Sequence, residues 1–190
     1  MARTESTMLA LGTTAPEFAL DDVTTGKHVT LKQAAGSRGL LVMFICRHCP
    51  FVKHIEGELA KLGKDYEGQE LGIVAISSND AVTYPDDAPA SLKEQARELD
   101  FLFPYLFDER QDVARAYHAA CTPDFFLFDE KLRLVYRGQF DDSRPDNGVP
   151  VTGSDLRGAM DALLAGKPIS QQQRPSLGCN IKWKESVAVG

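Results

Sequence analysis

The chain has 190 residues, of which 43% are hydrophobic and 25% are charged, as in an average soluble globular domain. This composition excludes a disordered chain and a collagen-like repeat, and four cysteines are too few for a disulfide-rich miniprotein. Acidic residues outnumber basic ones by 27 to 21, so neither nucleic acid nor an anionic membrane surface is expected as a partner.

The N-terminal stretch predicts no export and no membrane anchor. No apolar run in the chain approaches the roughly 18 residues of a membrane span. The apolar patch from Met8 to Leu11 is too short for the core of a signal peptide. We therefore expect a cytoplasmic protein. Because thiols are kept reduced in the cytoplasm, cysteines at a special spacing indicate catalysis or metal binding rather than structural disulfides.

The first half of the chain predicts a strand–helix–strand unit. A polar, turn-rich opening predicts a hairpin that ends at 28–31. The unbroken apolar run 39–45 is typical of a strand buried on both faces. Over 50–66, apolar residues recur at spacings of three and four, which predicts an amphipathic helix. A second apolar run, 71–76, completes a crossover unit and predicts a parallel pair of strands.

The second half predicts helices followed by a strand–strand–helix unit. Residues 77–90 are rich in Ser, Asp and Pro and predict a surface loop. Ser91 and Glu94 have the spacing of a capping box for a helix that ends near 99. Asp108 is expected to cap a further helix. An antiparallel hairpin and a last helix are predicted after it, with the strands at 125–128 and 132–136 and the helix at 156–164.

This order of elements predicts a single α/β domain over 1–190. We expect a central mixed sheet flanked by helices, with an N-terminal hairpin extension. The core is predicted to span about 10–166. The tail, 167–190, has no usable periodicity, although it contains Cys179.

The motif Cys46-Arg47-His48-Cys49 falls where the buried strand ends and the amphipathic helix begins. Free amide groups and the helix dipole stabilise a thiolate at such a place. In motifs of this kind the pKa of the thiol falls from about 8.5 to roughly 3.5–7.5. We expect Cys46 to be the more exposed, nucleophilic thiolate and Cys49 to be the resolving thiol. Arg47 and His48 are expected to place positive charge beside the thiolate, which makes the disulfide a better oxidant.

The alternative interpretation of this motif is half of a structural zinc site. Zinc takes four ligands, usually from two such pairs. The remaining candidates form no second pair, so no metal is predicted; they are His48, His54, His118, Cys121 and Cys179.

A second element, Cys121-Thr122-Pro123, directly precedes a predicted strand. An X-Pro bond at the entry of a strand is a candidate cis peptide. The Thr122 backbone, next to Pro123, is expected to pair with an extended substrate. Cys121 and Cys179 are candidate extra redox thiols, and for both a buried packing role is the favoured alternative.

Together these residues resemble the thioredoxin superfamily, within its thiol-specific-antioxidant and alkyl-hydroperoxide-reductase branch. The closest resemblance is to a peroxiredoxin-like group with a CxxC motif. The opening motif is 12–18, the active-site motif is 44–50, the cis-proline turn is 122–123, and the tail motif Gly-Cys-Asn-Ile-Lys-Trp is 178–183. The resemblance implies a thioredoxin-like fold and a redox-active disulfide.

Two departures from these families bear on activity. Peroxiredoxins carry the pattern Pro-x-x-x-Thr/Ser-x-x-Cys, which ends at the peroxidatic cysteine. Neither Cys46 nor Cys49 is preceded by Pro and Thr or Ser at these positions. Strong peroxidase activity is therefore not expected. Thioredoxins carry Trp before the first cysteine and an acid in the preceding strand, whereas here Ile45 follows a wholly apolar strand. Deprotonation of Cys49 would then depend on His48 or a water.

The sequence therefore predicts a cytoplasmic thiol–disulfide oxidoreductase that needs no organic cofactor. Its substrate is expected to be a disulfide-bearing protein or small molecule. A second, dithiol protein is expected to reduce the disulfide that this chain acquires in the reaction. The alternative is an antioxidant thiol peroxidase, in which one of the two cysteines is oxidised to sulfenic acid. A third hypothesis is a non-catalytic, binding or metal-sequestering protein.

Overall fold

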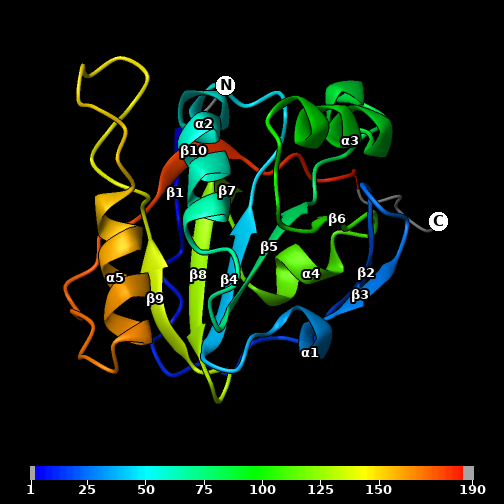
Figure 1. Cartoon of the computed structure of the whole chain (residues 1–190). Helices are drawn as coiled ribbons and strands as arrows, with labels where there is room; N and C mark the ends of the chain where they lie inside the picture. Colours follow the sequence, from blue (N-terminus) through cyan, green and yellow to red (C-terminus); the bar gives the residue numbers. More distant parts are fainter. Residues whose placement is uncertain (1–2, 186–190) are drawn as a thin grey trace.

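A computed structural model describes residues 3–185 and shows a mixed sheet with helices on both sides (Figure 1). Strand β4 (Gly39–Phe44) pairs antiparallel with β8 (Asp124–Asp129), which pairs antiparallel with β9 (Leu134–Gly138). On its other side β4 lies beside β5 (Leu71–Ser77), and the Ile45 N–H donates to the Ile76 carbonyl at 3.0 Å. Within the described range, no helix has the length and apolar character that a bilayer crossing requires.

The sheet continues beyond β5 to the N-terminal hairpin. Strand β5 pairs parallel with β6 (Tyr105–Phe107), and β6 pairs antiparallel with β2 (Ala19–Asp22). Strand β2 in turn pairs with β3 (His28–Thr30), which confirms the hairpin predicted near the N-terminus.

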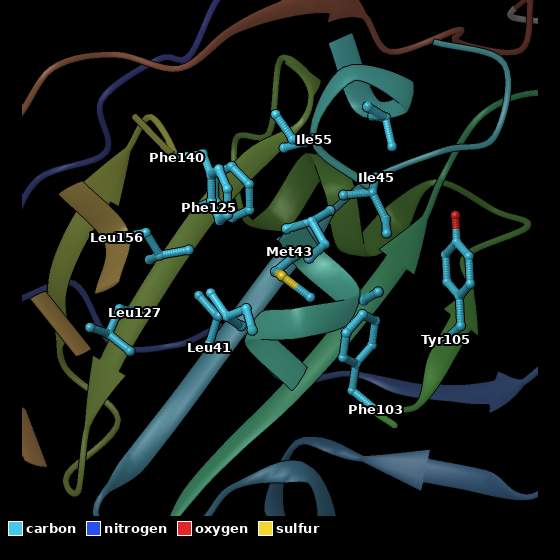
Figure 2. Packing of buried hydrophobic residues seen from close by; sticks show 14 of the residues in the cluster. Leu41, Met43, Ile45, Ile55, Phe103, Tyr105, Phe125, Leu127, Phe140 and Leu156 are labelled. Atoms are coloured by element: carbon cyan, nitrogen blue, oxygen red, sulfur yellow. The ribbon is translucent and has the colours of Figure 1, made fainter. Parts of the chain in front are cut away.

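Alternate residues of β4 face two separate apolar clusters, which explains why the whole strand is apolar. Leu41 and Met43 pack on the side that is covered by α2, α3 and α5 (Figure 2). Leu40 and Val42 pack on the side that holds α1 and α4. Burial on both faces fits the prediction from the unbroken apolar run. Residues 3–185 form the α-helices α1 (Leu31–Ala34), α2 (Pro50–Asp65), α3 (Pro89–Glu98), α4 (Asp112–Ala116) and α5 (Ser154–Leu164).

Of the two helix caps predicted in the second half, the capping box is wrong, whereas Asp108 does accept an N–H of the first turn of α4, although Gln111 is the N-cap residue. Helix α3 begins at Pro89 with Ala88 as its N-cap, so Ser91 lies inside the helix and forms no capping box with Glu94. Proline at the first helical position is favourable because its φ is already helical. Asp108 lies outside α4, and its carboxylate accepts the Ala114 N–H at 2.9 Å from there.

The segment 77–90 is not simply a surface loop. Ser77, Ser78, Asn79 and Asp87 are buried, and the short 3-10 helix η1 (Pro85–Asp87) lies within it. Ser78 donates to Asp108 at 2.9 Å and Asn79 donates to Asp87 at 2.8 Å, so hydrogen bonds inside the protein allow this polar segment to be buried.

The C-terminal tail forms part of a second, three-stranded sheet. Strand β10 (Leu177–Asn180) lies between β1 (Arg3–Glu5) and β7 (Cys121–Thr122), antiparallel to both. The tail has no usable periodicity in the sequence, because pairing with segments so distant in sequence leaves no local pattern. Its strand lies against the cis-proline turn that the sequence analysis singled out.

Candidate active site

The cysteine motif lies at the junction of β4 and α2, as predicted. Cys49 is the N-cap of α2 and Pro50 is its first residue, where the missing N–H of proline costs no helical hydrogen bond. Free amide groups of the first turn therefore face the end of the motif. In this structure all cysteines of the chain carry free thiols.

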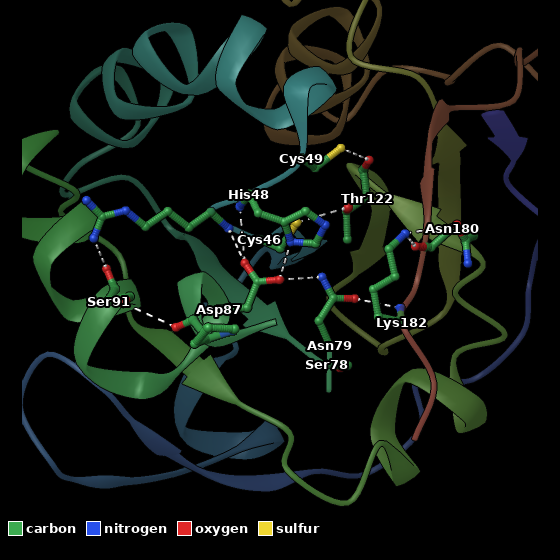
Figure 3. A network of polar contacts seen from close by, with 12 residues as sticks. Cys46, His48, Cys49, Ser78, Asn79, Asp87, Ser91, Thr122, Asn180 and Lys182 are labelled. Atoms are coloured by element: carbon green, nitrogen blue, oxygen red, sulfur yellow. Dashed lines mark hydrogen bonds and ion pairs between the residues drawn. The ribbon is translucent and has the colours of Figure 1, made fainter. Parts of the chain in front are cut away.

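Both thiols of the motif meet at Thr122. The Cys46 sulfur lies 3.2 Å from the Thr122 hydroxyl, and the Cys49 thiol donates to the Thr122 carbonyl at 3.2 Å (Figure 3). The peptide bond between Thr122 and Pro123 is cis, as predicted. The structure thus brings the four predicted residues together in one site.

Of the two candidate extra thiols, Cys179 reaches this site. In the register of β7 and β10 it is the partner of Thr122, whose carbonyl oxygen lies 3.2 Å from the Cys49 sulfur, and it packs in the same buried cluster as both motif cysteines. Cys121 is also buried, but its thiol donates to the Pro123 carbonyl at 3.6 Å and not to Cys46. The site therefore contains the thiols of Cys46, Cys49 and Cys179 in one buried cluster around Thr122.

The pKa values of the three thiols shift in opposite directions. Hydrogen bonds from the thiols of Cys179 and Cys46 lower the pKa of Cys49, and the Val52 N–H in the first helical turn lowers it further. Burial raises the pKa of Cys46, with the hydrogen bond to Cys49 and the charge of Asp87 acting in the same direction. The pKa of Cys179 is also raised, first by its hydrogen bond to Cys49 and then by burial.

The exposure that was expected of Cys46 is wrong, and the division of roles between the two motif cysteines stays a prediction. Cys46 was predicted to be the exposed thiolate, but it is fully buried and has a raised pKa. Cys49 is buried as well, yet it receives the donors of the helix N-terminus and of two thiols. The sequence predicts a thiolate on Cys46 at the helix start, whereas the directions of the two pKa shifts favour Cys49.

Asp87, at the end of η1, carries a buried carboxylate that organises the motif, and sequence reasoning missed it. One oxygen accepts the backbone N–H groups of Arg47 at 2.9 Å and His48 at 3.1 Å. The other accepts the His48 ring N–H and the Asn79 amide, the latter at 2.8 Å (Figure 3). Burial raises the pKa of Asp87, but hydrogen bonds from His48 and Asn79 outweigh it and leave the pKa below 3.8.

Arg47 and His48 do not supply the free positive charge that was expected beside the thiolate. The Arg47 guanidinium points to α3, where it binds Glu94 at 2.8 Å and Glu98 at 3.3 Å. His48 is bound to ionised Asp87, and its ring stacks on Tyr84 with centroids 5.2 Å apart. The prediction of a more oxidising disulfide therefore loses the electrostatic argument on which it rested.

The Thr122 backbone was expected to be available to a substrate, and here it is occupied. Thr122 pairs with Cys179 of β10, and its side chain and carbonyl contact the two motif thiols. Thr122 is 2% exposed, and so is Cys179. The chain's own C-terminal strand thus lies where an extended substrate was predicted to pair.

One group of side chains has atoms close enough for a metal ion. A sulfur of Cys46, a ring nitrogen of His48 and a carboxylate oxygen of Asp87 lie within 4.8 Å of one another. The Asp87 carboxylate already accepts four hydrogen bonds, so no lone pair is free for a metal. These residues do not fit a metal ion, and the absence of a metal cofactor stays a prediction.

A second buried acid, Asp124, directly follows the cis-proline. It opens β8 as the register partner of Phe44, and neither of its carboxylate oxygens has a hydrogen-bond partner. Burial raises its pKa well above the ordinary value. The sequence signal was an acid at the start of an otherwise apolar strand.

Comparison with known proteins agrees with this fold. The model of the AhpC/TSA family matches residues 11–137. The chain is 54% identical to a structurally solved, uncharacterized conserved protein from Geobacillus kaustophilus. That alignment covers 98% of each chain with a TM-score of 0.96.

More distant relatives carry redox names. The chain is 27% identical over 127 residues to the thiol-disulfide oxidoreductase ResA of Geobacillus kaustophilus, which covers 67% of this chain and 68% of ResA. It shares its fold with the thioredoxin domain of a thiol-disulfide oxidoreductase from Bacteroides vulgatus, at 22% identity and a TM-score of 0.57. That likeness covers 68% of this chain and 88% of the domain, and it confirms the predicted thioredoxin-like fold.

Proposed function

The chain belongs to the AhpC/TSA family, as its motifs predicted, and on this premise we propose that it is a thiol–disulfide oxidoreductase acting through the Cys46–Cys49 dithiol. Family membership confirms the broader prediction of an oxidoreductase enzyme. One observation carries the finer proposal. Both motif sulfurs contact Thr122 beside a cis-proline, at the N-terminus of α2.

The exchange begins on Cys49, because the thiolate and not the thiol is the nucleophile. The Cys49 sulfur attacks one sulfur of a substrate disulfide, forms a mixed disulfide and releases the other substrate sulfur as a thiolate. Cys46 gives its proton to that leaving thiolate and attacks the Cys49 sulfur. The bond between Cys49 and the substrate breaks as the Cys46–Cys49 disulfide forms, and the second substrate sulfur leaves as a thiolate that takes its proton from solvent. Two electrons pass from the protein to the substrate, and a reducing dithiol partner restores them.

The buried carboxylate of Asp87 has a positioning role in this proposal. It fixes the backbone between the two cysteines through the N–H groups of Arg47 and His48. Its charge favours the protonated form of Cys46, which keeps the single negative charge on Cys49. In this proposal Cys46 holds the proton and Cys49 holds the negative charge until the two sulfurs form their disulfide.

The experiment measures reduction of oxidised glutathione, with dithiothreitol as the reductant, by the full-length protein. Wild type is compared with Cys46→Ser, Cys49→Ser and the matched control Cys121→Ser. The proposal predicts loss of turnover in Cys46→Ser and Cys49→Ser and unchanged turnover in Cys121→Ser. Turnover that survives in Cys49→Ser would refute it.

Peroxide reduction is the second candidate, and the stabilised thiolate on Cys49 favours it. The thiolate would attack one peroxide oxygen, break the O–O bond and become a sulfenic acid, and the other oxygen would leave as water or an alcohol. The sulfenic acid would then condense with a neighbouring thiol to a disulfide, which releases a water molecule. The positions expected to hold Pro and Thr or Ser for this chemistry are Val42 and Cys46. Consumption of hydrogen peroxide no faster than by free cysteine would exclude this candidate.

A further inference from the structure

We propose that Cys179 is a third redox thiol that exchanges with Cys49 inside the fold, so that the disulfide passes between Cys46–Cys49 and Cys49–Cys179. This inference rests on the proposed function, because the Cys46–Cys49 disulfide is its starting point. It assigns a chemical role to the C-terminal strand, which otherwise would only cover the site.

The geometry that carries this inference converges on Thr122. The Cys49 thiol donates to the Thr122 carbonyl at 3.2 Å, while Cys179 is the register partner of Thr122 in the neighbouring strand. Cys46, Cys49 and Cys179 belong to the same buried cluster, and Cys179 is only 2% exposed. Cys49 therefore shares one buried cluster, centred on Thr122, with a thiol of its own motif and a thiol of β10.

Polar contacts on both sides of Cys179 hold β10 in this register. On one side, the Ser176 hydroxyl donates to the Pro123 carbonyl at 2.6 Å. On the other side, the Lys182 N–H donates to the Asn79 side chain at 2.8 Å. These anchors fix where the Cys179 thiol lies, as a reacting group requires.

Gly178 explains how the strand comes so close to the cis-proline turn. A Cβ atom at this position would lie 2.0 Å from the Thr122 carbonyl oxygen and 3.1 Å from the Pro123 nitrogen. Both are backbone atoms that cannot move aside. The residue before Cys179 must therefore lack a side chain for Cys179 to reach the dithiol.

The exchange is balanced within the chain. The Cys179 sulfur attacks the Cys49 sulfur of the Cys46–Cys49 disulfide, and the bond between Cys46 and Cys49 breaks. The electron pair of that bond stays on the Cys46 sulfur, which takes the proton that Cys179 gave up. One disulfide and one thiol are present before and after, so no external oxidant or reductant is consumed. The product links α2 to β10 and leaves Cys46 as a free thiol.

Cys121 provides the internal contrast. It is as buried as the other thiols and lies in β7, beside the same turn. Its thiol donates to the Pro123 carbonyl instead of a sulfur. If burial alone explained the cysteines of this site, Cys121 and Cys179 would behave alike on oxidation.

The test oxidises full-length Cys46→Ser protein with oxidised glutathione, blocks free thiols with N-ethylmaleimide and maps disulfides by mass spectrometry. The inference predicts a Cys49–Cys179 disulfide, with loss of maleimide labelling at both residues. The double variant Cys46→Ser/Cys121→Ser should give the same disulfide. A stable Cys49–glutathione adduct with Cys179 still labelled would overturn the inference.

A second measurement needs no change at Cys46. Wild type is mixed with oxidised glutathione and quenched with maleimide at successive times. Labelling of Cys46 should fall and then return while labelling of Cys179 falls, and Cys179→Ser and Cys179→Ala should retain a permanent Cys46–Cys49 disulfide. If those variants form that disulfide and wild-type Cys179 stays labelled throughout, only the third thiol is refuted. If no protein forms the Cys46–Cys49 disulfide, the proposed function itself fails.

Discussion

Asp87 binds His48 twice, through the backbone N–H at 3.1 Å and through the imidazole, although 39 residues separate them in the sequence. Because a carboxylate can only accept hydrogen bonds, the imidazole carries its proton on Nδ1. The same carboxylate accepts the N–H of Arg47. A buried anion from a distant loop therefore sets the conformation between the two cysteines and places negative charge beside Cys46.

Replacing Asp87 by Asn tests this anion. The neutral amide cannot accept all four hydrogen bonds, so Asp87→Asn should lower the free energy of unfolding by about 2–4 kcal/mol at pH 7. The pKa of Cys46 should fall, because the charge that raises it is gone. Urea unfolding and the pH dependence of alkylation measure the two effects. Asp86→Asn, at the exposed neighbouring position, should change neither.

The same carboxylate predicts how stability responds to acid. The pKa of Asp87 in the folded state lies below 3.8, so its contribution is complete above about pH 4 and is lost as the pH falls through the folded-state pKa. Asp87→Asn should therefore show a shallower loss of stability below pH 4 than wild type. Urea unfolding between pH 2 and pH 5 measures the slope, and equal slopes for the two proteins would contradict the assignment.

The position of the thiolate is directly measurable. We predict one thiolate in the reduced protein at pH 7, located on Cys49, because its lowered pKa contrasts with the raised pKa of Cys46 and Cys179. Its ionisation gives up the hydrogen bond that the Cys49 thiol donates to the Thr122 carbonyl. Thiolate absorbance near 240 nm should disappear in Cys49→Ser and persist in Cys121→Ser. Absorbance that disappears in Cys46→Ser but persists in Cys49→Ser would restore the original assignment of Cys46.

Much of this fold could be predicted because its signals are local. The apolar run that became β4 and the periodic apolar residues of α2 each record burial within a few consecutive residues. The cysteine motif and the cis bond at Pro123 are also short patterns. Their meeting in one site follows from the thioredoxin-like fold that these patterns together predicted.

The parts that were missed depend on contacts between distant segments. Asp87 belongs to a polar segment whose composition is that of a surface loop, and only tertiary hydrogen bonds reveal it as buried. The pairing of Cys179 with Thr122 joins segments that no spacing rule connects. The thiolate proposed on Cys49 depends on both of these distant residues. The charge of Asp87 raises the pKa of Cys46, and Cys179 lowers the pKa of Cys49. The cytoplasmic location stays a prediction.

Asp124 should make the protein less stable as the pH rises. Its folded-state pKa is well above 3.8, so the folded protein holds a proton that the unfolded chain releases. Stability therefore falls as the pH rises from about 4 toward the folded-state pKa. Asp124→Asn keeps the shape of the side chain and removes its titrating carboxyl group. The difference in melting temperature between the variant and wild type should therefore be more positive at pH 8 than at pH 4. A uniform decrease at every pH would contradict this account.

Gly178 should be intolerant of a side chain. Gly178→Ala places a methyl group against the Thr122 carbonyl oxygen and should lower the free energy of unfolding by about 1–3 kcal/mol. Displacement of β10 should also speed maleimide labelling of Cys179. Gly57→Ala is the matched control, because its Cβ enters open space on α2 and should stabilise the helix by roughly 0.5–1 kcal/mol. Equal labelling rates in the two variants would show that β10 does not depend on Gly178.

The most direct test of the account is a disulfide map of the wild-type protein across a series of glutathione redox buffers, with alkylation and mass spectrometry at each potential. We predict that a Cys46–Cys49 disulfide forms reversibly and that every disulfide within the chain contains Cys49. A disulfide that joins Cys46 to Cys121 or Cys179 without Cys49 would contradict the account, as would motif thiols that stay reduced across the whole series.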